Sequence, residues 1–431
     1  MLEEIFINTQ TCKIIGAGLA GSEAALVLAR NGVKVKLYEM RPHKQTPVHK
    51  TGNAAELVCS NSFKSMKPNT AAGMLKHELE VLDSPIYKAA LETKVDAGMA
   101  LAVNRDEFSR KITQAILANP NIELIRSEVV DLDDELTILA TGPLTSDALA
   151  DKIKQITGED ELAFYDAAAP IVMADSLDMN IIFSQDRYDD GAGDYLNAPM
   201  SKEEYDNFIH ELTHAQCVIT KDFETKELFQ ACQPVEQVAK SGHDAPRFGA
   251  MKPVGLTDPR TGKRPYAAVQ LRAENKEKTA YNLVGFQTNL TFTEQKRVFR
   301  MILGLKNAEF VRYGVMHRNT FINAPKLLDK SLKLKENLYV TGQLSGTEGY
   351  LEAVRSGHHA ALSILGYDAP PKDTVFGALL DYACNPETKH YQPMHVNFGI
   401  LPKIDERNKK LRYEKYAERG NAAIEEYARK L

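Results

Sequence analysis

Two cysteines stand in sequence surroundings where a thiol could do chemistry. Cys59 lies in ELVCSNSFKS, a polar stretch in which small polar residues follow it. Cys232 lies in LFQACQPVEQVAKSG, two residues before Pro234. A thiol becomes a nucleophile when its surroundings favour the thiolate, whereas a free cysteine packed in a core behaves as a small hydrophobic residue. On the residues alone, both interpretations are open for both positions.

The other cysteines, Cys12, Cys217 and Cys384, lie at a strand start, in an apolar run and after a helical pattern, which predicts structural roles. Five cysteines with wide spacing argue against a disulfide framework and suit a reducing cytoplasm. No C-x-x-C pair occurs. We therefore expect neither a zinc knuckle nor a local redox pair.

The elements that must position such a thiol begin with a glycine-rich turn. Residues 13–42, KIIGAGLAGSEAALVLARNGVKVKLYEMRP, carry G-x-G-x-x-G between an apolar strand and a helical pattern. This order is typical of a dinucleotide-binding βαβ unit, in which the glycines allow a tight turn, approach of a pyrophosphate and close helix packing. The helix N-terminus then offers free N–H groups to the phosphates. The predicted phosphate-binding residues are Gly16, Ala17, Gly18, Leu19, Ala20 and Gly21.

An acidic residue follows the second predicted strand where such folds hold a ribose. Glu39 comes 18 residues after Gly21 and could accept hydrogen bonds from ribose hydroxyls. Arg41, in EMRP, could contact the phosphate or adenine side of the same dinucleotide. The alternative for Arg41 is a surface arginine at a strand end.

Two later strand ends also carry glycine. The apolar run at 136–140 continues into Gly142, and residues 338–350, LYVTGQLSGTEGY, form a second strand and turn with Gly342, Gln343 and Gly349. Flavoproteins of the two-dinucleotide-fold type use such a return near the C-terminus to complete the cofactor cradle. A nicotinamide dehydrogenase does not need it, so the two separated turns favour FAD over NAD.

The pattern predicts an α/β fold: a Rossmann-like FAD-binding domain of the two-dinucleotide-fold type, with an inserted α/β domain. Residues 1–167 and 323–431 would form the FAD-binding domain, and residues 168–322 the inserted domain on the substrate and RNA side. Predicted helical stretches span residues 71–92, 105–118, 201–214, 351–365 and 403–431.

The charge balance excludes a globally basic protein. The 431 residues carry a net charge of −5, so a nucleic-acid partner must be held by a local patch. Residues 247–272 carry six Lys and Arg against one acid, Asp258, which gives +5. Such an excess predicts contacts with a phosphate backbone, and a solvated charge run is the alternative. The predicted RNA-binding residues are Arg247, Lys252, Arg260, Lys263 and Arg264.

The remaining sequence features concern three histidines, the longest apolar runs and the N-terminus. His317, with Arg318, Asn319 and Asn323 after it, could face the flavin or substrate amides, or be structural. The pair His358-His359 has no carboxylate at ligand spacing, so no metal site is predicted. The chain has no apolar run long enough to span a membrane, and its N-terminus does not read as a signal peptide.

A set of longer motifs resembles the folate- and FAD-dependent tRNA (uracil-5-)-methyltransferases. The motifs are GAGLAGSEAA, LYEMRP, K-x-T-P-x-H at residues 44–49, AELVCSNS, YLNAPMSKEEY, PVE after a cysteine, and VTGQLSGTEGY. They occur in the family's order and cover nearly the whole chain. AELVCSNS and the cysteine before PVE are far more specific than the nucleotide fingerprint.

The resemblance implies methylation of uridine C5 in the tRNA T-loop, at position 54, to form 5-methyluridine. 5,10-Methylenetetrahydrofolate would donate the carbon, reduced FAD the reducing equivalents, and NADH or NADPH would recharge the flavin. The family pattern places the catalytic thiols at Cys59 and Cys232. One would attack uracil C6 and the other would assist proton removal, with the assignment open.

The expected partners are tRNA and folate, with neither DNA nor a membrane, in the cytoplasm, and no oligomeric state is predicted. A sister enzyme that methylates a ribosomal RNA uridine is one alternative. A flavin oxidoreductase acting on a small molecule is another, and it predicts full turnover after loss of both thiols. An FAD-bearing RNA-binding module without enzymatic activity is the third.

Overall fold

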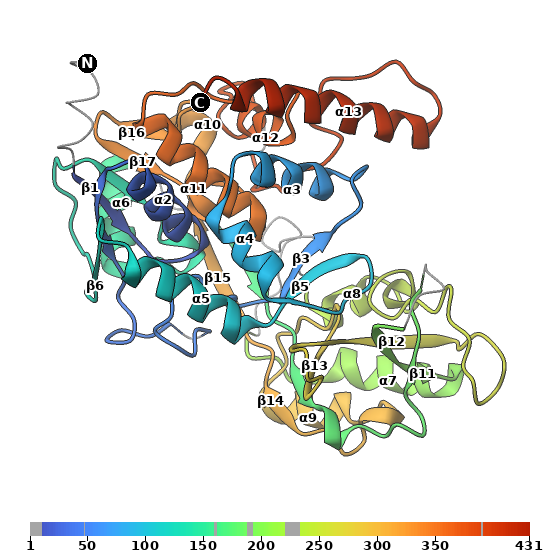
Figure 1. Ribbon diagram of the computed structural model, residues 1–431. Coiled ribbons are helices and arrows are strands. Elements are labelled where there is room, and N and C mark those ends of the chain that lie inside the picture. The colour runs from blue at the N-terminus through green and yellow to red at the C-terminus, as the bar shows by residue number, and fades with distance from the viewer. Residues whose placement is uncertain (1–10, 47, 159–161, 188–192, 220–232, 389–390) are drawn as a thin grey trace.

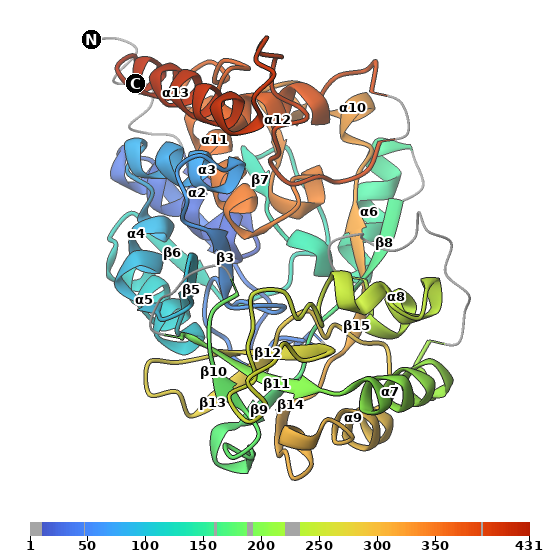
Figure 2. The same ribbon diagram turned by 90° about the vertical axis from the view of Figure 1, so that its right-hand side faces the viewer.

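The computed structural model shows two lobes joined by a two-stranded ribbon (Figure 1, Figure 2). It describes residues 11–46, 48–158, 162–187, 193–219, 233–388 and 391–431. The large lobe, uppermost in both views, combines the first third of the chain with its C-terminal part. The small lobe holds the middle of the chain.

A six-stranded sheet of order β16-β17-β7-β1-β2-β6 forms the centre of the large lobe. Five strands run parallel, and β16 pairs antiparallel at one edge. The strands are β1 (Thr11–Ile15), β2 (Lys34–Tyr38), β6 (Ile122–Ile125), β7 (Thr137–Leu139), β16 (Lys333–Lys335) and β17 (Leu338–Val340). This sheet confirms the predicted Rossmann-like fold, and β17 brings the second glycine turn beside the first.

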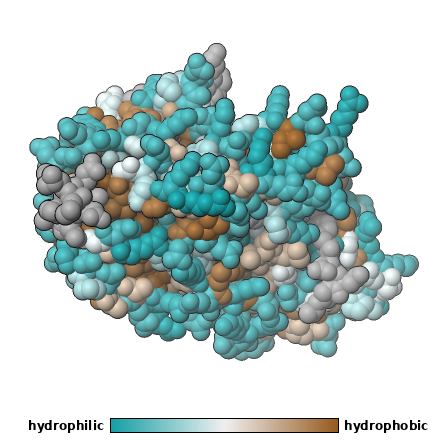
Figure 3. Space-filling view, turned by 45° about the horizontal axis from the view of Figure 1, so that its top comes forward, coloured by the Kyte–Doolittle hydropathy of each residue, from teal (hydrophilic) through white to brown (hydrophobic). Residues whose placement is uncertain are grey.

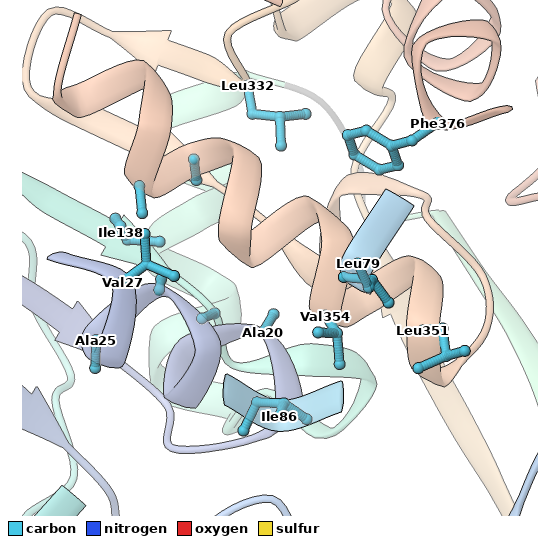
Figure 4. Packing of buried hydrophobic residues seen from close by; sticks show 14 of the residues in the cluster. Ala20, Ala25, Val27, Leu79, Ile86, Ile138, Leu332, Leu351, Val354 and Phe376 are labelled. Carbon is cyan, nitrogen blue, oxygen red and sulfur yellow. The ribbon is translucent and has the colours of Figure 1, made fainter. Parts of the chain in front are cut away.

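Two helices form the core on one side of this sheet. Helix α2 (Leu19–Arg30) is buried along residues 20–29 because the sheet and α11 (Tyr350–Ile364) enclose it. Figure 4 shows Ala20 of α2 close to Val354 of α11, and Val27 of α2 close to Ile138 of the sheet. Burial on two sides explains why α2 reads as a nearly continuous apolar sequence.

The helical stretch predicted over residues 71–92 is in fact two helices, α3 (Ala71–Val81) and α4 (Pro85–Glu92). Ser84 caps α4 by accepting a hydrogen bond from the Tyr87 N–H, and Pro85 occupies the first turn, where no donor is required. Asp83 adopts a φ of 59°, which turns the chain between the helices. This local capping outweighs the continuous helical pattern.

The remaining elements of the large lobe cover its edges. Helix α5 (Arg105–Ala118) coincides with its prediction, whereas α13 (Lys409–Ala428) begins later than expected because Asn408 caps it. The others are β3 (Ser62–Ser65), β4 (Lys94–Val95), β5 (Ala100–Val103), α6 (Asp147–Thr157), α10 (Ala324–Leu327) and α12 (Val375–Ala383).

The small lobe has its own antiparallel sheet, of order β10-β11-β12-β13-β9-β14. Its strands are β9 (Ile171–Met173), β10 (Phe183–Ser184), β11 (Tyr195–Met200), β12 (Ala267–Ala273), β13 (Ala280–Leu283) and β14 (Phe310–Arg312), with helices α7 (Lys202–His214), α8 (Val235–Ser241) and α9 (Phe292–Phe299). Ser201 and Glu204 form a capping box at the start of α7. The aromatic residues Tyr205, Phe208, Phe286 and Phe299 fill a core separate from that of the large lobe.

The ribbon between the lobes pairs β8 (Leu162–Ala167) with β15 (Met316–Phe321). The strands are antiparallel, with Leu162 opposite Phe321 and Ala167 opposite Met316. The chain therefore leaves the large lobe and returns to it along neighbouring strands. The predicted domain boundaries, after residues 167 and 322, lie next to the ends of these strands and stay predictions.

The outer surface is mainly hydrophilic on the face shown in Figure 3, with small separated hydrophobic areas. Within the described ranges, no helix is both long and apolar enough to cross a bilayer.

Candidate cofactor and thiol site

A cavity of about 400 Å³ lies where the glycine turns of the large lobe meet. Its walls come from the turns after β1, β7 and β17 and from the segment that carries Cys59. The predicted cofactor residues that line it are Gly16, Gly18, Leu19, Ala20, Glu39, Arg41, Gly142, Gly342, Gln343 and Gly349. The fold thus brings the two distant turns and one candidate thiol to a single cavity.

Two glycines shape the first turn by close backbone approach. Gly16 has a φ of +101°, and a Cβ there would lie 2.5 Å from the Ala140 carbonyl oxygen. A Cβ on Gly21 would lie 1.9 Å from the Gly16 carbonyl oxygen. Gly21 therefore packs the helix against the turn, behind the cavity wall, and the fully buried Ala17 lies behind it as well.

The residues present fit a bound dinucleotide. A Cβ added to Gly18 or Gly142 would meet no atom within 4 Å, although both residues line the cavity. Helix α2 begins after Gly18 without a side-chain cap, so its first N–H groups are left for another acceptor. Open space beside an uncapped helix N-terminus is what a pyrophosphate requires.

Glu39 and Arg41 form a buried pair at one end of the cavity. The Glu39 carboxylate accepts hydrogen bonds from Arg41 Nε at 2.9 Å and from the Ala17 N–H at 3.1 Å. Burial opposes ionisation of Glu39, but the hydrogen bonds and charge of Arg41 outweigh it and lower the pKa of this carboxyl. Arg41 is only 2% exposed and also contacts Glu56 at 3.2 Å, which excludes the surface alternative. Ribose binding by Glu39 stays a prediction.

His49 lines the cavity. It is the last residue of the K-x-T-P-x-H motif, but it was not among the predicted cofactor or catalytic residues. Its Nδ1 lies 2.6 Å from the Thr46 hydroxyl. Burial, followed by the charge of Arg41, lowers the pKa of His49 to about 4. The imidazole is therefore neutral at physiological pH.

Cys59 lies in the wall of the cavity, unlike the cysteines of the core. Its N–H and that of Ser60 donate to Tyr350 Oη at 2.9 and 3.0 Å, and its thiol donates to the Ala167 carbonyl over 3.7 Å. Tyr350 begins α11 directly after the second glycine turn, so this hydroxyl ties the Cys59 segment to that turn. Burial, followed by the charge of a Cys59 thiolate, raises the pKa of Tyr350 and keeps the phenol protonated.

The other described cysteines occupy different surroundings. Cys12 and Cys384 are buried, and burial raises the pKa of each thiol to about 12. Cys217 is half-buried, and burial raises its pKa as well. These positions agree with the structural roles expected for them.

Lys64 and His395 also line the cavity, and no sequence signal pointed to them. Lys64 Nζ lies 3.2 Å from Glu352 Oε1, a buried carboxylate on α11. Burial, followed by the nearby charge of Lys64, lowers the pKa of His395.

Cys232 lies outside the described residues, so its proposed role stays a prediction. The glutamate of the PVE motif that follows it is described. Glu236, in the first turn of α8, is buried and accepts hydrogen bonds from the Asn289 N–H at 2.6 Å and from the Thr288 hydroxyl at 3.0 Å. Burial raises the pKa of Glu236. This part of the motif anchors α8 to the small lobe.

One of the six basic residues counted between residues 247 and 272 does not lie on the surface. Arg272 is 6% exposed, because it lies within β12 and points to the junction between the lobes. Arg260 pairs with Asp258 at 2.8 Å, and Arg247 stacks on Tyr266 with 3.6 Å to the ring centroid. Lys263 and Arg264 are exposed. RNA binding by this loop stays a prediction.

The remaining candidate residues lie away from the cavity or beyond description. His317, Arg318 and Asn319 fall in β15, where only their backbone is described. Asn323 precedes α10 without capping it through its side chain.

The two adjacent histidines of α11 are core residues. His358 Nδ1 lies 2.7 Å from Glu23 Oε1, a carboxylate contributed by α2. His359 Nε2 lies 2.7 Å from the Lys330 carbonyl oxygen. In the part of the chain that the structure describes, no group of three or more His, Cys, Asp or Glu side chains could hold a metal ion.

The sequence matches, over residues 11–368, a family model described as Glucose inhibited division protein A. Relatives from Koribacter versatilis (strain Ellin345) and Bacillus subtilis (strain 168) are 49% and 50% identical, over 431 and 429 residues. The first alignment covers 96% of each chain, and the second covers 97% of this chain and 99% of the relative. Both relatives are named methylenetetrahydrofolate–tRNA-(uracil-5-)-methyltransferase TrmFO.

The fold is similar to that of Aquifex aeolicus GidA in two crystal forms. The TM-scores are 0.70 for form I and 0.68 for form II, both at 15% identity. The form I comparison covers 97% of this chain and 76% of that chain, and the form II comparison covers 98% and 74%. This likeness shows the arrangement of the fold.

Proposed function

This chain belongs to the glucose inhibited division protein A family, and from that premise we propose that it is a methylenetetrahydrofolate-dependent tRNA (uracil-5-)-methyltransferase that works with FAD, the family that its motifs resemble. The proposed target is the T-loop uridine at position 54, and the proposed product is 5-methyluridine. NADH or NADPH would reduce the flavin. The proposed setting is the cytoplasm.

One observation carries this proposal: a cavity built from two glycine turns also has a cysteine in its wall. Gly18 and Gly342 belong to separate strand–turn–helix units, and Cys59 lies on the segment between the first unit and β3. A cofactor cradle alone would need no thiol. Since the thiol faces the same cavity as the turns, a substrate held by the thiol would lie next to the cofactor.

The proposed chemistry begins with the uracil ring, whose C5 is a poor nucleophile. A thiolate, from Cys59 or Cys232, adds to C6 and places the electron pair of the C5–C6 double bond on an enolate. The enolate carbon then forms a bond to the methylene carbon that the folate carries, and one of the two bonds from that carbon to folate nitrogens breaks, with its electron pair left on the nitrogen. A base removes the C5 proton, and expulsion of the thiolate restores the double bond.

The carbon arrives at the methylene level, so a hydride equivalent (two electrons and a proton) would replace its remaining bond to a folate nitrogen, and tetrahydrofolate would leave with a proton on that nitrogen. Reduced FAD supplies these reducing equivalents when it is bound. Residues of this chain that would hold FAD are the glycines of both turns, with Glu39 and Arg41 at the far end. The neutral His49 and Tyr350, both in the wall, are hydrogen-bonding groups that carry no charge into the cavity.

A direct assay tests the proposal. The purified protein should be yellow, and with methylenetetrahydrofolate and NADPH it should place 5-methyluridine at position 54 of an unmodified tRNA transcript. Ribosomal RNA fragments provide the competing substrate. Product in ribosomal RNA alone would move the assignment to the sister activity, and no product from flavin-loaded protein in either RNA would remove the methyltransferase proposal.

A trapping experiment assigns the thiols. RNA that carries 5-fluorouracil has no C5 proton to lose, so the covalent adduct at C6 should persist. Loss of the adduct in Cys59→Ala or in Cys232→Ala, but not in both, would name the nucleophile. The other cysteine would then be the candidate for assisting proton removal.

A further inference from the structure

The segment 57–61 of the large lobe is held by three arginines, two of which come from the small lobe. Arg312, at the end of β14, donates from one nitrogen, Nη2, to the Val58 carbonyl at 2.6 Å and to the Val48 carbonyl at 3.1 Å. These carbonyls immediately precede Cys59 and His49, which both line the cavity. One guanidinium nitrogen thus fixes the backbone before two cavity residues.

Arg272 holds the other side of the same segment. From β12 its Nη2 donates to Ser60 Oγ at 2.8 Å, and its Nε donates to Asn61 Oδ1 at 2.9 Å. Asn61 is fully buried, and its Nδ2 donates to Val103 O in the large lobe and to Ala273 O in the small lobe, both at 3.1 Å. The residues after Cys59 are therefore bonded across the junction in both directions.

Arg105, from the start of α5 in the large lobe, completes the set. It donates to the Leu57 carbonyl at 2.9 Å and to the Cys59 carbonyl at 3.3 Å. Its guanidinium also pairs with Glu274 of the small lobe at 2.6 Å, and Glu274 is 8% exposed. The carbonyls of residues 57, 58 and 59 are thus each bonded to an arginine.

The arginines also set the charge around the thiol. Burial and, to a smaller extent, the positive charge of Arg105 lower the pKa of Arg312, whereas the negative charge of Glu274 acts in the opposite direction. A guanidinium here contributes both hydrogen bonds and charge.

We propose that Arg272 and Arg312 are positioning residues for Cys59, so that the seating of the small lobe on the large lobe sets the place of the thiol in the cavity. This inference rests on the proposed catalytic role of Cys59. It assigns a task to two residues of the small lobe that neither the glycine motifs nor the cysteine motifs contain.

The test uses the flavin-loaded full chain with Gln and Lys in place of each arginine. Arg312→Gln should lower kcat for tRNA methylation at least tenfold with KM for tRNA within twofold, and should slow alkylation of Cys59 by iodoacetamide at pH 7.5 at least fivefold. Arg312→Lys should regain most of both rates, because one ammonium can serve both carbonyls. Arg272→Lys should not restore either rate, because two different nitrogens of the planar Arg272 guanidinium donate to Ser60 and Asn61, and one ammonium cannot replace both.

Two internal references separate positioning from general damage. Arg300→Gln removes another guanidinium of the small lobe that bonds a carbonyl, that of Ala308, and it should change neither rate. Alkylation of Cys217, located by peptide mass spectrometry, should stay constant in every variant. Flavin content should match the wild type, and rates are compared at a temperature where every variant is folded, because loss of these guanidinium bonds should lower the melting temperature.

The outcomes decide the proposal in each case. Wild-type kcat and wild-type Cys59 alkylation in the Gln variants would overturn it. If the Gln variants fail to fold, the two Lys variants decide, and equal wild-type rates in both would overturn it. Alkylation needs neither folate nor RNA, so it tests the positioning of Cys59 even if the methyltransferase proposal fails.

Discussion

Two groups of arginines in the small lobe, one in the loop 247–264 and one at the junction with the large lobe, differ in almost every physical respect. In the loop 247–264, the Arg260 side chain is 40% exposed and pairs with Asp258, two residues away. At the junction with the large lobe, Arg272 is buried and Arg312 is half-buried, and both bond residues more than 200 positions distant in the sequence. Exposed pairs contribute little because water screens them, whereas a buried guanidinium must have all its partners in place.

The comparison teaches that a local charge count does not measure what charged residues do. Arg272 raised the count of the loop, yet it is the residue that reaches toward Cys59. The loop surface available to a polyanion is therefore less positive than the sequence indicates, and the junction between the lobes is more positive. The predictions below test whether the junction or the loop has the greater influence on the protein.

The comparison would break completely if the thiol at the junction had no role in turnover. We expect Cys59→Ala to lower tRNA methylation at least about 1,000-fold, because loss of a nucleophile or of the group that assists it removes an entire step. Flavin content should not change, since Cys59 forms one part of the wall and the glycine turns form most of it. Formation of 5-methyluridine, measured by nucleoside mass spectrometry, checks this.

Cys217→Ala is the matched control, because Cys217 is a partly exposed free thiol of the small lobe. Its activity should stay within about twofold of the wild type. A Cys59→Ala enzyme that retains more than a tenth of wild-type activity would contradict the prediction.

The second prediction concerns stability and compares two ion pairs. Arg105→Gln leaves the Glu274 carboxylate buried without its charge partner, which should lower the free energy of unfolding by about 3–5 kcal/mol. Arg260→Gln removes a guanidinium that is 40% exposed, and the buried Asp258 keeps a hydrogen bond from the N–H of residue 260, so the loss should be smaller, about 1–2 kcal/mol. Urea denaturation followed by circular dichroism measures both. Equal midpoints for the two variants would contradict the contrast between buried and exposed pairs.

The third prediction extends the contrast to histidines. Burial, with the charge of a neighbouring arginine, lowers the pKa of His49 to about 4 and that of His359 to about 3. An unfolded histidine titrates near 6.5, so the unfolded chain binds protons first as the pH falls. The free energy of unfolding is therefore highest above about pH 6.5. It decreases as the pH falls toward 3–4, and at pH 5 the loss is roughly 2 kcal/mol per histidine.

Unfolding free energies at pH 7 and pH 5 check this sign. His359→Gln should make the difference between the two pH values smaller by roughly 2 kcal/mol. His43→Gln, at an exposed position of the same lobe, should leave the difference unchanged. A His359→Gln protein with the wild-type pH dependence would contradict the assignment.

The smallest expected effect belongs to the loop. Changing Lys263 and Arg264 to Ala should weaken tRNA binding several-fold and reduce the slope of log affinity against log salt by roughly 1.5, which corresponds to two lost phosphate contacts. Arg260→Ala should do less, because Asp258 already compensates its charge. Filter binding at several salt concentrations measures the slope. Lys276→Ala with Lys306→Ala is the control, and an equal change there would remove the loop as a specific site.

What could be predicted from the sequence was local. Gly16, Gly18 and Gly21 could be placed because a βαβ unit encodes its turn within about ten residues, and the return at Gly342 repeats that logic. The helix over residues 105–118 coincided with its prediction because Asn104 caps it at its first residue. The break at Ser84-Pro85 is also a local signal, but the predicted helix over residues 71–92 followed the helical periodicity on either side and ran through it.

What could not be predicted depended on contacts across the chain. Arg312 contacts a carbonyl 254 residues away, and Arg272 contacts a hydroxyl 212 residues away. A backbone carbonyl leaves no trace in residue identity, so no spacing rule connects these positions. Two residues of the cavity wall, Lys64 and His395, could not be predicted either, because no sequence pattern marked them as site residues.

The ribbon of β8 and β15 has a consequence for how such a protein could be assembled and taken apart. Ala167 and Met316 are paired, so the ends of the intervening stretch lie side by side. A gene encoding only the parallel-sheet lobe could therefore acquire the middle segment in one event, and a short hairpin linking residues 167 and 316 could replace it. Such a shortened chain should keep the glycine turns, but the stretch around Cys59 would lose two of its three arginine supports. Cofactor binding by the large lobe and the support of the Cys59 segment would then be physically separable.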